Sequence, residues 1–404
     1  MSSPRVLLLT TYYHPVLGGV ETNVRRLAAF LARAGFDVRI ITKRVYADSP
    51  RDERIDDVPV HRLPPVGDRS PAGKWLMLPF AFAALLRRRR EYDLICCVDY
   101  RGIGVAAIMA GRLLRRPVVV QAGTTGVLSC SNWDDADARR GLGPVGLVGR
   151  LARRPLRTIY GAASAYLCIS REIEEEALTC GVPRARIHYL PHSIDTGEFH
   201  PPQDQERARI RSEEGWPADR LNVLYVGRLS REKGVLDLME AWRLLDRPDA
   251  HLVIVGPDMP AHPWDAGPRV RELIAQHGLA DRVRVLGPRA DVARLLRGAD
   301  LFVQPSHFEA FGISVIEAMA TGLPIVATAV GGMLDYLVDR DNALLAPAQD
   351  PAALADRIGE ALNGAALRQH LGTRARATVE ALFDEAVVFG RTADLLRTLA
   401  ARPA

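Results

Sequence analysis

The 404-residue sequence lacks several patterns that mark whole classes of protein. Its five cysteines form no C-x-x-C pair and have no metal-ligand spacing, which argues for buried, reduced thiols and against a zinc or disulfide framework. No apolar run approaches the ~20 residues that a membrane-spanning helix needs. The opening residues MSSPRVLLLTTYYHP show no signal-peptide cleavage pattern. We therefore expect a cytoplasmic protein.

Two further absences exclude functions. The fingerprint G-x-G-x-x-G does not occur, which argues against a dinucleotide-binding dehydrogenase. The net charge is only +5, too small an excess to indicate a nucleic-acid partner. The basic excess is local, however: residues 74–157 hold 15 Lys and Arg against 6 Asp and Glu. This part of the chain is the one expected to face anions.

What the sequence does contain is a regular alternation of strand and helix patterns. The apolar run RVLLLTTYY predicts a buried parallel strand, and VETNVRRLAAFLARAG then has the helical period and ends at a glycine. The alternation restarts with NVLYVGRL near Leu221. The pattern predicts an α/β protein with two Rossmann-like, doubly wound parallel-sheet domains. Predicted bounds are 1–195 and 221–385 for the domains, 196–220 for a proline-rich linker and 386–404 for a final helix.

Glycine and basic residues stand where such sheets bind ligands. Gly18 and Gly19 lie between a strand and a helix, where the backbone can approach a ligand closely, although a plain tight turn reads the same way. Arg228 and Lys233 follow a predicted strand, at the edge where open α/β sheets bind anions. The alternative for this pair is a solvated charged loop.

The stretch HFEAFGISVIEAMATGLPIVAT places two carboxylates around a predicted helix start. The helix is expected to begin near Gly312 or Ile313, and its first amides suit a phosphate. Glu317 lies one turn inside the helix, and its side chain leans back towards the same end. Glu309 precedes the helix. For each glutamate alone, a surface or capping carboxylate is the competing interpretation.

Taken together, these stretches resemble glycosyltransferase family 4, the retaining sugar transferases of the GT-B fold, whose two domains face a central cleft. The resemblance extends over GGVETNVRRLAAFLARAGFDVRIIT, LPHSIDTGEFHP, YVGRLSREKGVLDLMEAW and PSHFEAFGISVIEAMATGLPIVATAVGG. The last stretch carries the E-x(7)-E signature of the family, from Glu309 to Glu317. The resemblance implies transfer of a sugar from a nucleotide-diphosphate donor to a hydroxyl acceptor.

The resemblance also assigns roles by position. Arg228 and Lys233 match the family's diphosphate-binding pair and, with Glu309, which holds the donor sugar, are the implied catalytic residues. Glu317 matches the ribose-binding carboxylate. Further donor contacts fall on Gly18, Gly19, Phe311, Gly312, Ile313 and Ser314. The final helix is expected to cross back to the first domain.

One position departs from the family. A histidine common in the first domain is replaced by Ala122, which leaves Gln121, Thr124 and Thr125 as candidates for that sugar contact. Because Arg228 and Lys233 can neutralise the leaving diphosphate, we expect neither a metal nor a cofactor. The acidic run DDAD, Asp134 to Asp137, is interpreted as a polar loop.

Other functions are compatible with the same residues. A GT-B enzyme that hydrolyses or epimerises nucleotide sugars, or a non-catalytic nucleotide-binding homologue, would share these residues. The acceptor could be a glycan, a lipid-linked molecule or a small metabolite. KWLMLPFAFAALLRRRREYD joins an apolar helix face to four arginines and allows peripheral association with an anionic membrane, although a helix packed on the sheet reads similarly.

Overall fold

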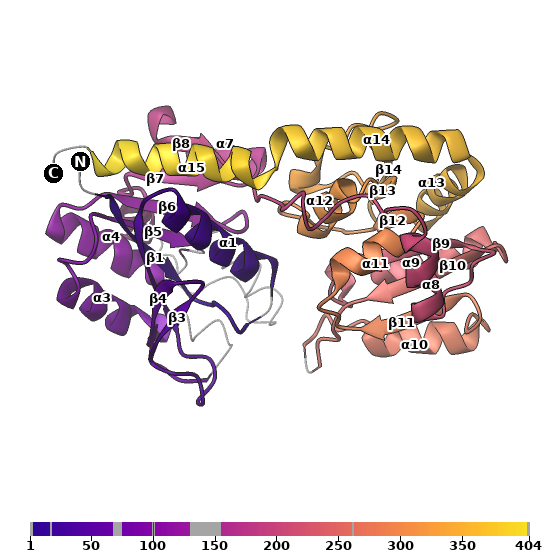
Figure 1. The fold of residues 1–404 in the computed structure, drawn as a ribbon, viewed down its shortest axis with the longest axis horizontal. Helices are drawn as coiled ribbons and strands as arrows, with labels where there is room; N and C mark the ends of the chain where they lie inside the picture. The colour runs from indigo at the N-terminus through magenta and orange to yellow at the C-terminus, as the bar shows by residue number, and fades with distance from the viewer. Residues whose placement is uncertain are drawn as a thin grey trace. The chain divides into compact units, whose positions relative to one another are not determined.

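The computed structural model describes residues 3–16, 18–67, 75–98, 100, 102–129, 155–260 and 262–401. The chain divides into two compact units, residues 1–192 with 388–404, and residues 193–387 (Figure 1). Each unit is built on its own sheet with helices on both faces, as the alternation of patterns predicts.

Unit 1 contains an eight-stranded sheet in the order β3-β4-β2-β1-β5-β6-β7-β8. All neighbouring strands run parallel except β3 and β4, which pair antiparallel at one edge. The strands are β1 (Arg5–Thr10), β2 (Asp37–Lys43), β3 (Asp52–Ile55), β4 (Val58–Leu63), β5 (Leu94–Val98), β6 (Val118–Ala122), β7 (Ala165–Cys168) and β8 (Ile187–Tyr189). Parallel pairing brings the carboxyl ends of β1 and β6 to one edge of the sheet.

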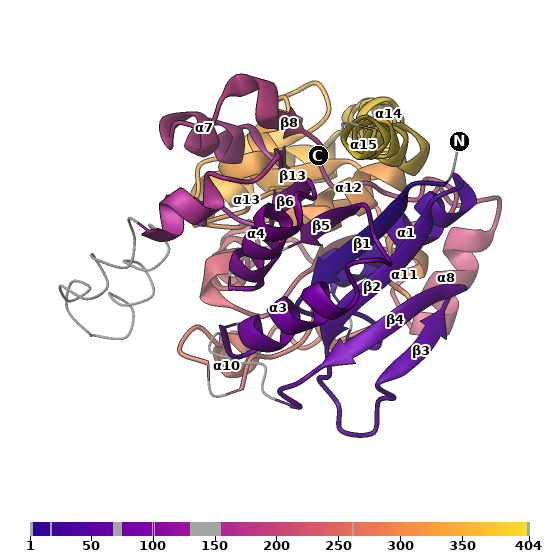
Figure 2. The ribbon, with the colours of Figure 1, turned by 90° about the vertical axis from the view of Figure 1, so that its left-hand side faces the viewer.

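Helices cover both faces of this sheet. α1 (Gly19–Arg33) buries Val24, Leu27, Ala28 and Leu31, the apolar stripe that its sequence predicts. α15 (Glu385–Ala400) packs beside it, with Phe389 5.6 Å from Phe30 between ring centroids. α3 (Leu78–Arg87) and α4 (Ile103–Leu114) lie side by side on the other face (Figure 2). α7 (Arg171–Thr179) and the short helix η1 (Arg184–Arg186) flank β7 and β8.

The cysteines of unit 1 behave largely as the sequence predicts. Cys96 and Cys97 are adjacent on β5 and both fully buried, because helices cover both faces of the strand. Cys168 is buried, whereas Cys180 is partly exposed. All four are free thiols. Cys130 lies outside the described residues.

Unit 2 contains a six-stranded, fully parallel sheet in the order β11-β10-β9-β12-β13-β14. The strands are β9 (Leu221–Val226), β10 (Ala250–Val255), β11 (Val283–Gly287), β12 (Leu301–Gln304), β13 (Ile325–Thr328) and β14 (Leu344–Ala346). The order reverses between β9 and β12, and it is at such a switch point that open parallel sheets bind ligands. In chain order, the helices are α8 (Glu206–Glu214), η2 (Arg231–Lys233), α9 (Val235–Leu245), α10 (Gly267–Gln276), α11 (Val292–Gly298), α12 (Ile313–Ala320), η3 (Gly331–Asp335), α13 (Pro351–Asn363) and α14 (Ala365–Leu382).

The predicted linker over 196–220 needs a correction. Residues Glu206–Glu214 form α8, which packs on α11 and belongs to unit 2. Its sequence ERARIRSEE contains only two apolar residues, Ala208 and Ile210, and they do not follow the helical period, so no hydrophobic pattern predicts the helix. Ion pairs hold it instead, among them Arg297 with Glu206 at 2.8 Å and Arg294 with Glu214 at 2.5 Å.

The two chain segments that connect the units are joined to each other within unit 2. Ile194 forms a parallel bridge with Asp384, and its amide donates to the carbonyl of Phe383 at 2.8 Å. The hydroxyl of Thr196 donates to the carboxylate of Asp384 at 2.5 Å. From Val388 onward the last helix clusters with unit 1, close to the predicted crossing near residue 386.

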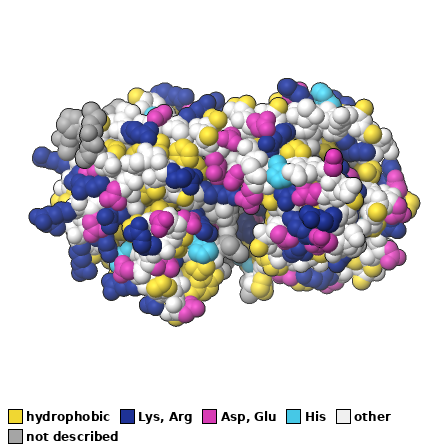
Figure 3. All heavy atoms as spheres, viewed as in Figure 1, with side chains coloured by type: hydrophobic (Ala, Val, Ile, Leu, Met, Phe, Trp, Pro, Cys, Tyr) yellow, Lys and Arg dark blue, Asp and Glu magenta, His cyan; other side chains and the backbone are white. Residues whose placement is uncertain are grey.

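Basic side chains gather at the end of unit 1 where α3 and α4 lie, at the left of the space-filling view (Figure 3). Within the described residues, no helix combines the length and apolar character needed to cross a bilayer.

Candidate active site

Two contacts fix the backbone at the carboxyl end of β9, where Arg228 lies. Gly256 has a φ of +148°, and a Cβ there would lie 1.8 Å from the carbonyl oxygen of Gly227, so only glycine permits this approach. The hydroxyl of Tyr225 donates to the carbonyl of Arg228 at 2.9 Å, and burial raises the pKa of this phenol well above its usual value. The backbone that carries Arg228 is therefore anchored from inside the core.

The predicted basic pair is held by two carboxylates. Arg228 Nη2 lies 2.5 Å from Glu232 Oε1, and Lys233 Nζ lies 2.6 Å from Glu309 Oε2. Arg228 remains half exposed, whereas Lys233 and Glu309 are mostly shielded. The carboxylate of Glu232 orients Arg228, and the backbone carbonyl of Glu232 accepts the amide of His307 at 2.9 Å.

The second predicted carboxylate lies in helix α12, which begins at Ile313 as the sequence predicts. Its N-cap, Gly312, has a φ of +90° that favours glycine. The amide of Val315 is already bonded to the carbonyl of Gly312 at 3.0 Å, leaving the amides of Gly312, Ile313 and Ser314 to face a ligand. Glu317 lies one turn further along α12, partly buried.

An aromatic residue that sequence reasoning missed supports this helix start. The hydroxyl of Tyr336 donates to the carbonyl of Phe311 at 2.6 Å and lies 3.4 Å from that of Gly312. The rings of Phe311, Tyr336 and Phe383 contact one another in tilted and edge-to-face geometry, with centroids 5.1 to 5.4 Å apart. Tyr336 lies four residues after the glycine pair Gly331 and Gly332. Nothing in this local pattern indicates a contact with Phe311, which is 25 positions away in the sequence.

A buried polar network at the end of β12 was also missed. Gln304 donates to the hydroxyl of Ser306 at 2.8 Å and accepts from the hydroxyl of Ser314 at 3.1 Å. Ser306 then reaches Oε2 of Glu309 at 3.3 Å. The network links the α12 start to the carboxylate of Glu309, so the two predicted halves of the site are held in one hydrogen-bonded unit.

A histidine and the glycine pair complete the loop. His307 Nε2 lies 2.7 Å from Oδ2 of Asp237 on α9, which ties the loop after β12 to the helix that follows Lys233. Gly332 donates its amide to the carbonyl of Glu309 at 2.9 Å. Gly331 has a φ of +52°, and a Cβ there would lie 2.0 Å from the same carbonyl oxygen. Gly331 and Gly332 therefore pack against the backbone of Glu309.

The first-domain candidates lie at the carboxyl edge of the unit 1 sheet. Gly18 is the extended N-cap of α1, which begins at Gly19. A Cβ on Gly18 would meet the carboxylate of Glu21, so an acidic group lies over the loop predicted to bind a diphosphate. Gln121 is the penultimate residue of β6, two strands away from β1.

The loop after β6 is tied down by one carboxylate. Glu176 on α7 accepts the amides of Gly126 and Ser129, each at 2.7 Å. Thr124 and Thr125 are partly buried in this loop. Their proposed contact with the sugar stays a prediction.

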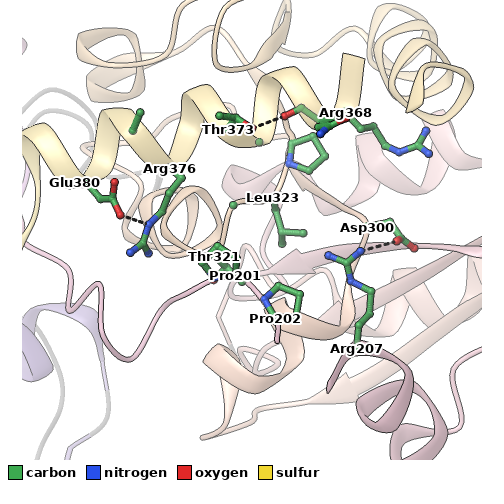
Figure 4. Close-up of a pocket in the computed structure, with 15 residues that line it drawn as sticks. Pro201, Pro202, Arg207, Asp300, Thr321, Leu323, Arg368, Thr373, Arg376 and Glu380 are labelled. Atoms are coloured by element: carbon green, nitrogen blue, oxygen red, sulfur yellow. Dashed lines mark hydrogen bonds and ion pairs between the residues drawn. The ribbon is translucent and has the colours of Figure 1, made fainter. Parts of the chain in front are cut away.

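A cavity of about 630 Å³ in unit 2 does not contain the predicted donor residues. It lies beside Asp300 and Pro324, which precede β12 and β13, and so at the sheet edge opposite Glu309 (Figure 4). Its arginines hold the fold: Arg376 donates to the carbonyl of Phe199 at 2.6 Å and Arg368 to those of α13. We therefore assign the site to the polar loops and not to this cavity.

No cluster of three or more potential metal ligands occurs among the residues that the structure describes. The acidic run Asp134 to Asp137, predicted to be a polar loop, lies outside them.

The comparisons with known proteins agree with this geometry. The family described as "Glycosyl transferases group 1" matches residues 206–378, and "Glycosyl transferase 4-like domain" matches residues 18–192. A D-inositol 3-phosphate glycosyltransferase of Xylanimonas cellulosilytica is 30% identical, over 93% of this chain and 92% of its own. A 2-deoxystreptamine N-acetyl-D-glucosaminyltransferase of Streptomyces fradiae is 30% identical, over 94% and 92%.

Solved structures show the same architecture over the full length. Sucrose-phosphate synthase from Thermosynechococcus elongatus superposes with a TM-score of 0.80 at 27% identity, covering 98% of this chain and 99% of that one. Anabaena HepE, solved with UDP and glucose, superposes at 0.77 with 22% identity, covering 98% and 100%, and shares the fold. The chain belongs to the GT-B glycosyltransferases of family 4 and is a sugar-transferring enzyme.

Proposed function

We propose that this enzyme transfers a sugar from a nucleotide-diphosphate donor to a hydroxyl acceptor with retention of configuration and without a metal. The observation that carries the proposal is the convergence of Arg228, Lys233, Glu309 and the α12 start at one edge of the unit 2 sheet. Two cations and open helix amides suit a diphosphate. A carboxylate beside them suits sugar hydroxyls.

The charge that develops on the leaving group determines the mechanism. As the bond from the anomeric carbon to the donor phosphate breaks, negative charge grows on the phosphate oxygen, and Lys233 and Arg228 stabilise it. The acceptor oxygen bonds to the anomeric carbon from the same face, and its proton passes to the departing phosphate. Glu309 orients the sugar, and no enzyme nucleophile is assigned.

The test uses a panel of UDP-, GDP- and ADP-sugars, first by thermal shift and then by product analysis. HepE was solved with UDP-glucose, which places UDP-sugars first in the panel. Names of the relatives, such as D-inositol 3-phosphate glycosyltransferase, make small polyhydroxy rings the first acceptors to try. Transfer in excess chelator with an α-linked product from an α-linked donor is expected. Metal-dependent rescue, or rapid hydrolysis without acceptor, would contradict the proposal.

A second observation favours reversible membrane association of unit 1. α3 and α4 lie next to one another and expose apolar side chains, Phe80 on the first and Met109 and Leu113 on the second, and Leu76 just before α3 is exposed as well. Arginines at the ends of both helices add positive charge, each worth roughly 1 kcal/mol near an anionic surface. Sedimentation with anionic and neutral vesicles tests this: binding to anionic vesicles at low salt only is expected. Equal sedimentation with both vesicle types would contradict it.

A further inference from the structure

A cavity of about 330 Å³ lies in unit 1 at the sheet edge opposite the loops that follow β1 and β6. It adjoins Pro117 and Ser164, which precede β6 and β7, and the C-terminal end of α4. Three arginines line it, Arg112, Arg115 and Arg116. Its location at the amino ends of the strands separates it from Gly18, Gly19 and Gln121, the unit 1 candidates at the carboxyl ends.

The neighbouring carboxylate cannot neutralise these arginines. Asp93 accepts the guanidinium of Arg5 at 2.6 and 3.1 Å and the backbone amide of Arg5 at 3.0 Å. Nη1 of Arg116 also donates to Oδ1 of Asp93, at 3.0 Å. The guanidinium groups of Arg112 and Arg115 form neither a hydrogen bond nor an ion pair with any residue that the structure describes. The cavity wall therefore carries uncompensated positive charge.

Helix capping does not explain the arginines either. Cations often stabilise the carbonyls at a helix C-terminus. Here the amide of Arg116 already bonds the carbonyl of Gly111 at 2.8 Å, and the amide of Arg115 bonds that of Arg112 at 3.4 Å. Arg115 itself has a φ of +52° and a ψ of 44°, a position that glycine occupies at lower cost. The chain keeps an arginine where its backbone favours glycine.

We propose that this cavity binds a phosphate ester. The guanidinium groups of Arg112, Arg115 and Arg116 can fork onto phosphate oxygens. Ser164 accepts the amide of Val118 at 3.1 Å through its oxygen, so its own proton is available to a fourth contact. Ile108, Val118 and Leu399 form an apolar wall for the organic part of the ligand. The volume of the cavity suits the phosphate ester of a small organic group such as glycerol.

The same chemistry has two sources, a free phosphate ester and the headgroup of an anionic lipid at the α3–α4 surface. Glycerol 3-phosphate is the soluble probe, and vesicles of phosphatidic acid are compared with phosphatidylglycerol vesicles of equal surface charge. Calorimetry is run in a chain carrying Arg228→Ala and Lys233→Ala, so that phosphate binding at the donor loops does not contribute. Because neither donor nor acceptor is present, failure here is independent of failure in sugar transfer.

The decisive variant combines Arg112→Gln with Arg115→Gly. Glycine relieves the positive φ, so the variant is expected to melt at or above the temperature of its parent while affinity falls roughly tenfold or more. Arg89→Gln is the matched control, since Arg89 is an exposed arginine just after α3 whose guanidinium bonds, among the described residues, only the carbonyl of Leu86 and which does not line the cavity.

Each result decides the proposal. Loss of glycerol 3-phosphate binding in the double variant alone supports a free phosphate ester. Loss of the preference for phosphatidic acid in that variant alone supports a lipid headgroup. Binding that is unchanged in the double variant, or reduced equally by Arg89→Gln, overturns the site and leaves the arginines as a solvated helix end.

Discussion

The Nζ atom of Lys233 lies 2.6 Å from Oε2 of Glu309, although 76 positions separate the two residues. Only 18% of the lysine side chain and 11% of the glutamate side chain are exposed, so solvent screens this ion pair less than a surface one. In the proposed reaction Lys233 contacts the diphosphate of the donor, and Glu309 contacts its sugar. A complete donor must therefore replace this ion pair with two contacts of its own.

Alanine variants at Lys233 and Glu309 are expected to have different effects on nucleotide binding and on sugar transfer. Lys233→Ala is expected to weaken nucleoside diphosphate binding by about tenfold or more, because a charge-assisted contact is lost. Glu309→Ala is expected to leave that affinity unchanged or slightly raised, because the lysine is released from its partner, and to abolish most of the transfer. Calorimetry with the nucleoside diphosphate and turnover with the full donor measure both.

Glu317→Ala serves as the companion variant. If Glu317 binds the ribose as proposed, its loss weakens nucleotide and donor binding alike. A nucleoside diphosphate affinity that falls equally in Glu309→Ala and Glu317→Ala would remove the proposed division between the two carboxylates.

Tyr336→Phe tests the support of the α12 start. The variant keeps the ring in contact with Phe311 and Phe383 but loses the hydrogen bond to the Phe311 carbonyl. A buried hydrogen bond of this kind contributes about 1 kcal/mol, so we expect a drop in stability of that order and a roughly three- to tenfold rise in KM for the donor. Urea unfolding and steady-state kinetics measure the two effects. A stability loss with an unaltered donor KM would limit Tyr336 to the fold.

Gly331→Ala is expected to displace Glu309. The added Cβ would stand 2.0 Å from the Glu309 carbonyl oxygen, and the backbone must shift to relieve the contact. A displacement near 1 Å can cost about a hundredfold in rate, so we expect a loss of that order in kcat/KM.

Gly278→Ala is the matched control for Gly331→Ala. Its φ is +62°, and a Cβ there meets nothing within 4 Å. Both variants carry a similar backbone penalty of about 1 kcal/mol. Only Gly331→Ala should lose activity, and a comparable activity loss in Gly278→Ala would assign the effect to backbone strain in general.

His251 makes the stability of unit 2 dependent on pH. Burial lowers the pKa of this imidazole to about 4, and its Nδ1 lies 3.0 Å from Oδ1 of Asn222. The unfolded chain, with a histidine pKa near about 6.5, binds more protons than the folded chain between these values. Stability is therefore complete above the unfolded pKa and decreases as pH falls towards 4, by at most about 1.4 kcal/mol per pH unit for this group.

Urea unfolding at pH 7 and pH 5 measures this effect. His251→Gln retains an N–H donor for Asn222 but no titrating group, so the difference between the two pH values should shrink. His192 in unit 1, whose pKa burial also lowers to about 4, is the companion position. An unchanged difference in His251→Gln would assign the pH dependence to other groups.

The sequence by itself determined the elements and their order. Strand and helix periods are local, and so the doubly wound α/β class, the start of α12 at Ile313 and the spacing of Glu309 and Glu317 could be predicted. The resemblance to family 4 rests on the same local stretches, and the comparisons confirm it. The absence of an apolar period in residues 206–214 is equally local, and it hid helix α8.

The tertiary structure alone decided which side chains meet. The pairing of Lys233 with Glu309 and the bond from Tyr336 to Phe311 each join residues from different βα units. Parallel strands bring such residues to one sheet edge, but their rotamers and partners depend on packing that no local pattern encodes. The close approach of Gly331 to the Glu309 carbonyl has the same origin: a contact between two loops exists only after both strands have entered the sheet.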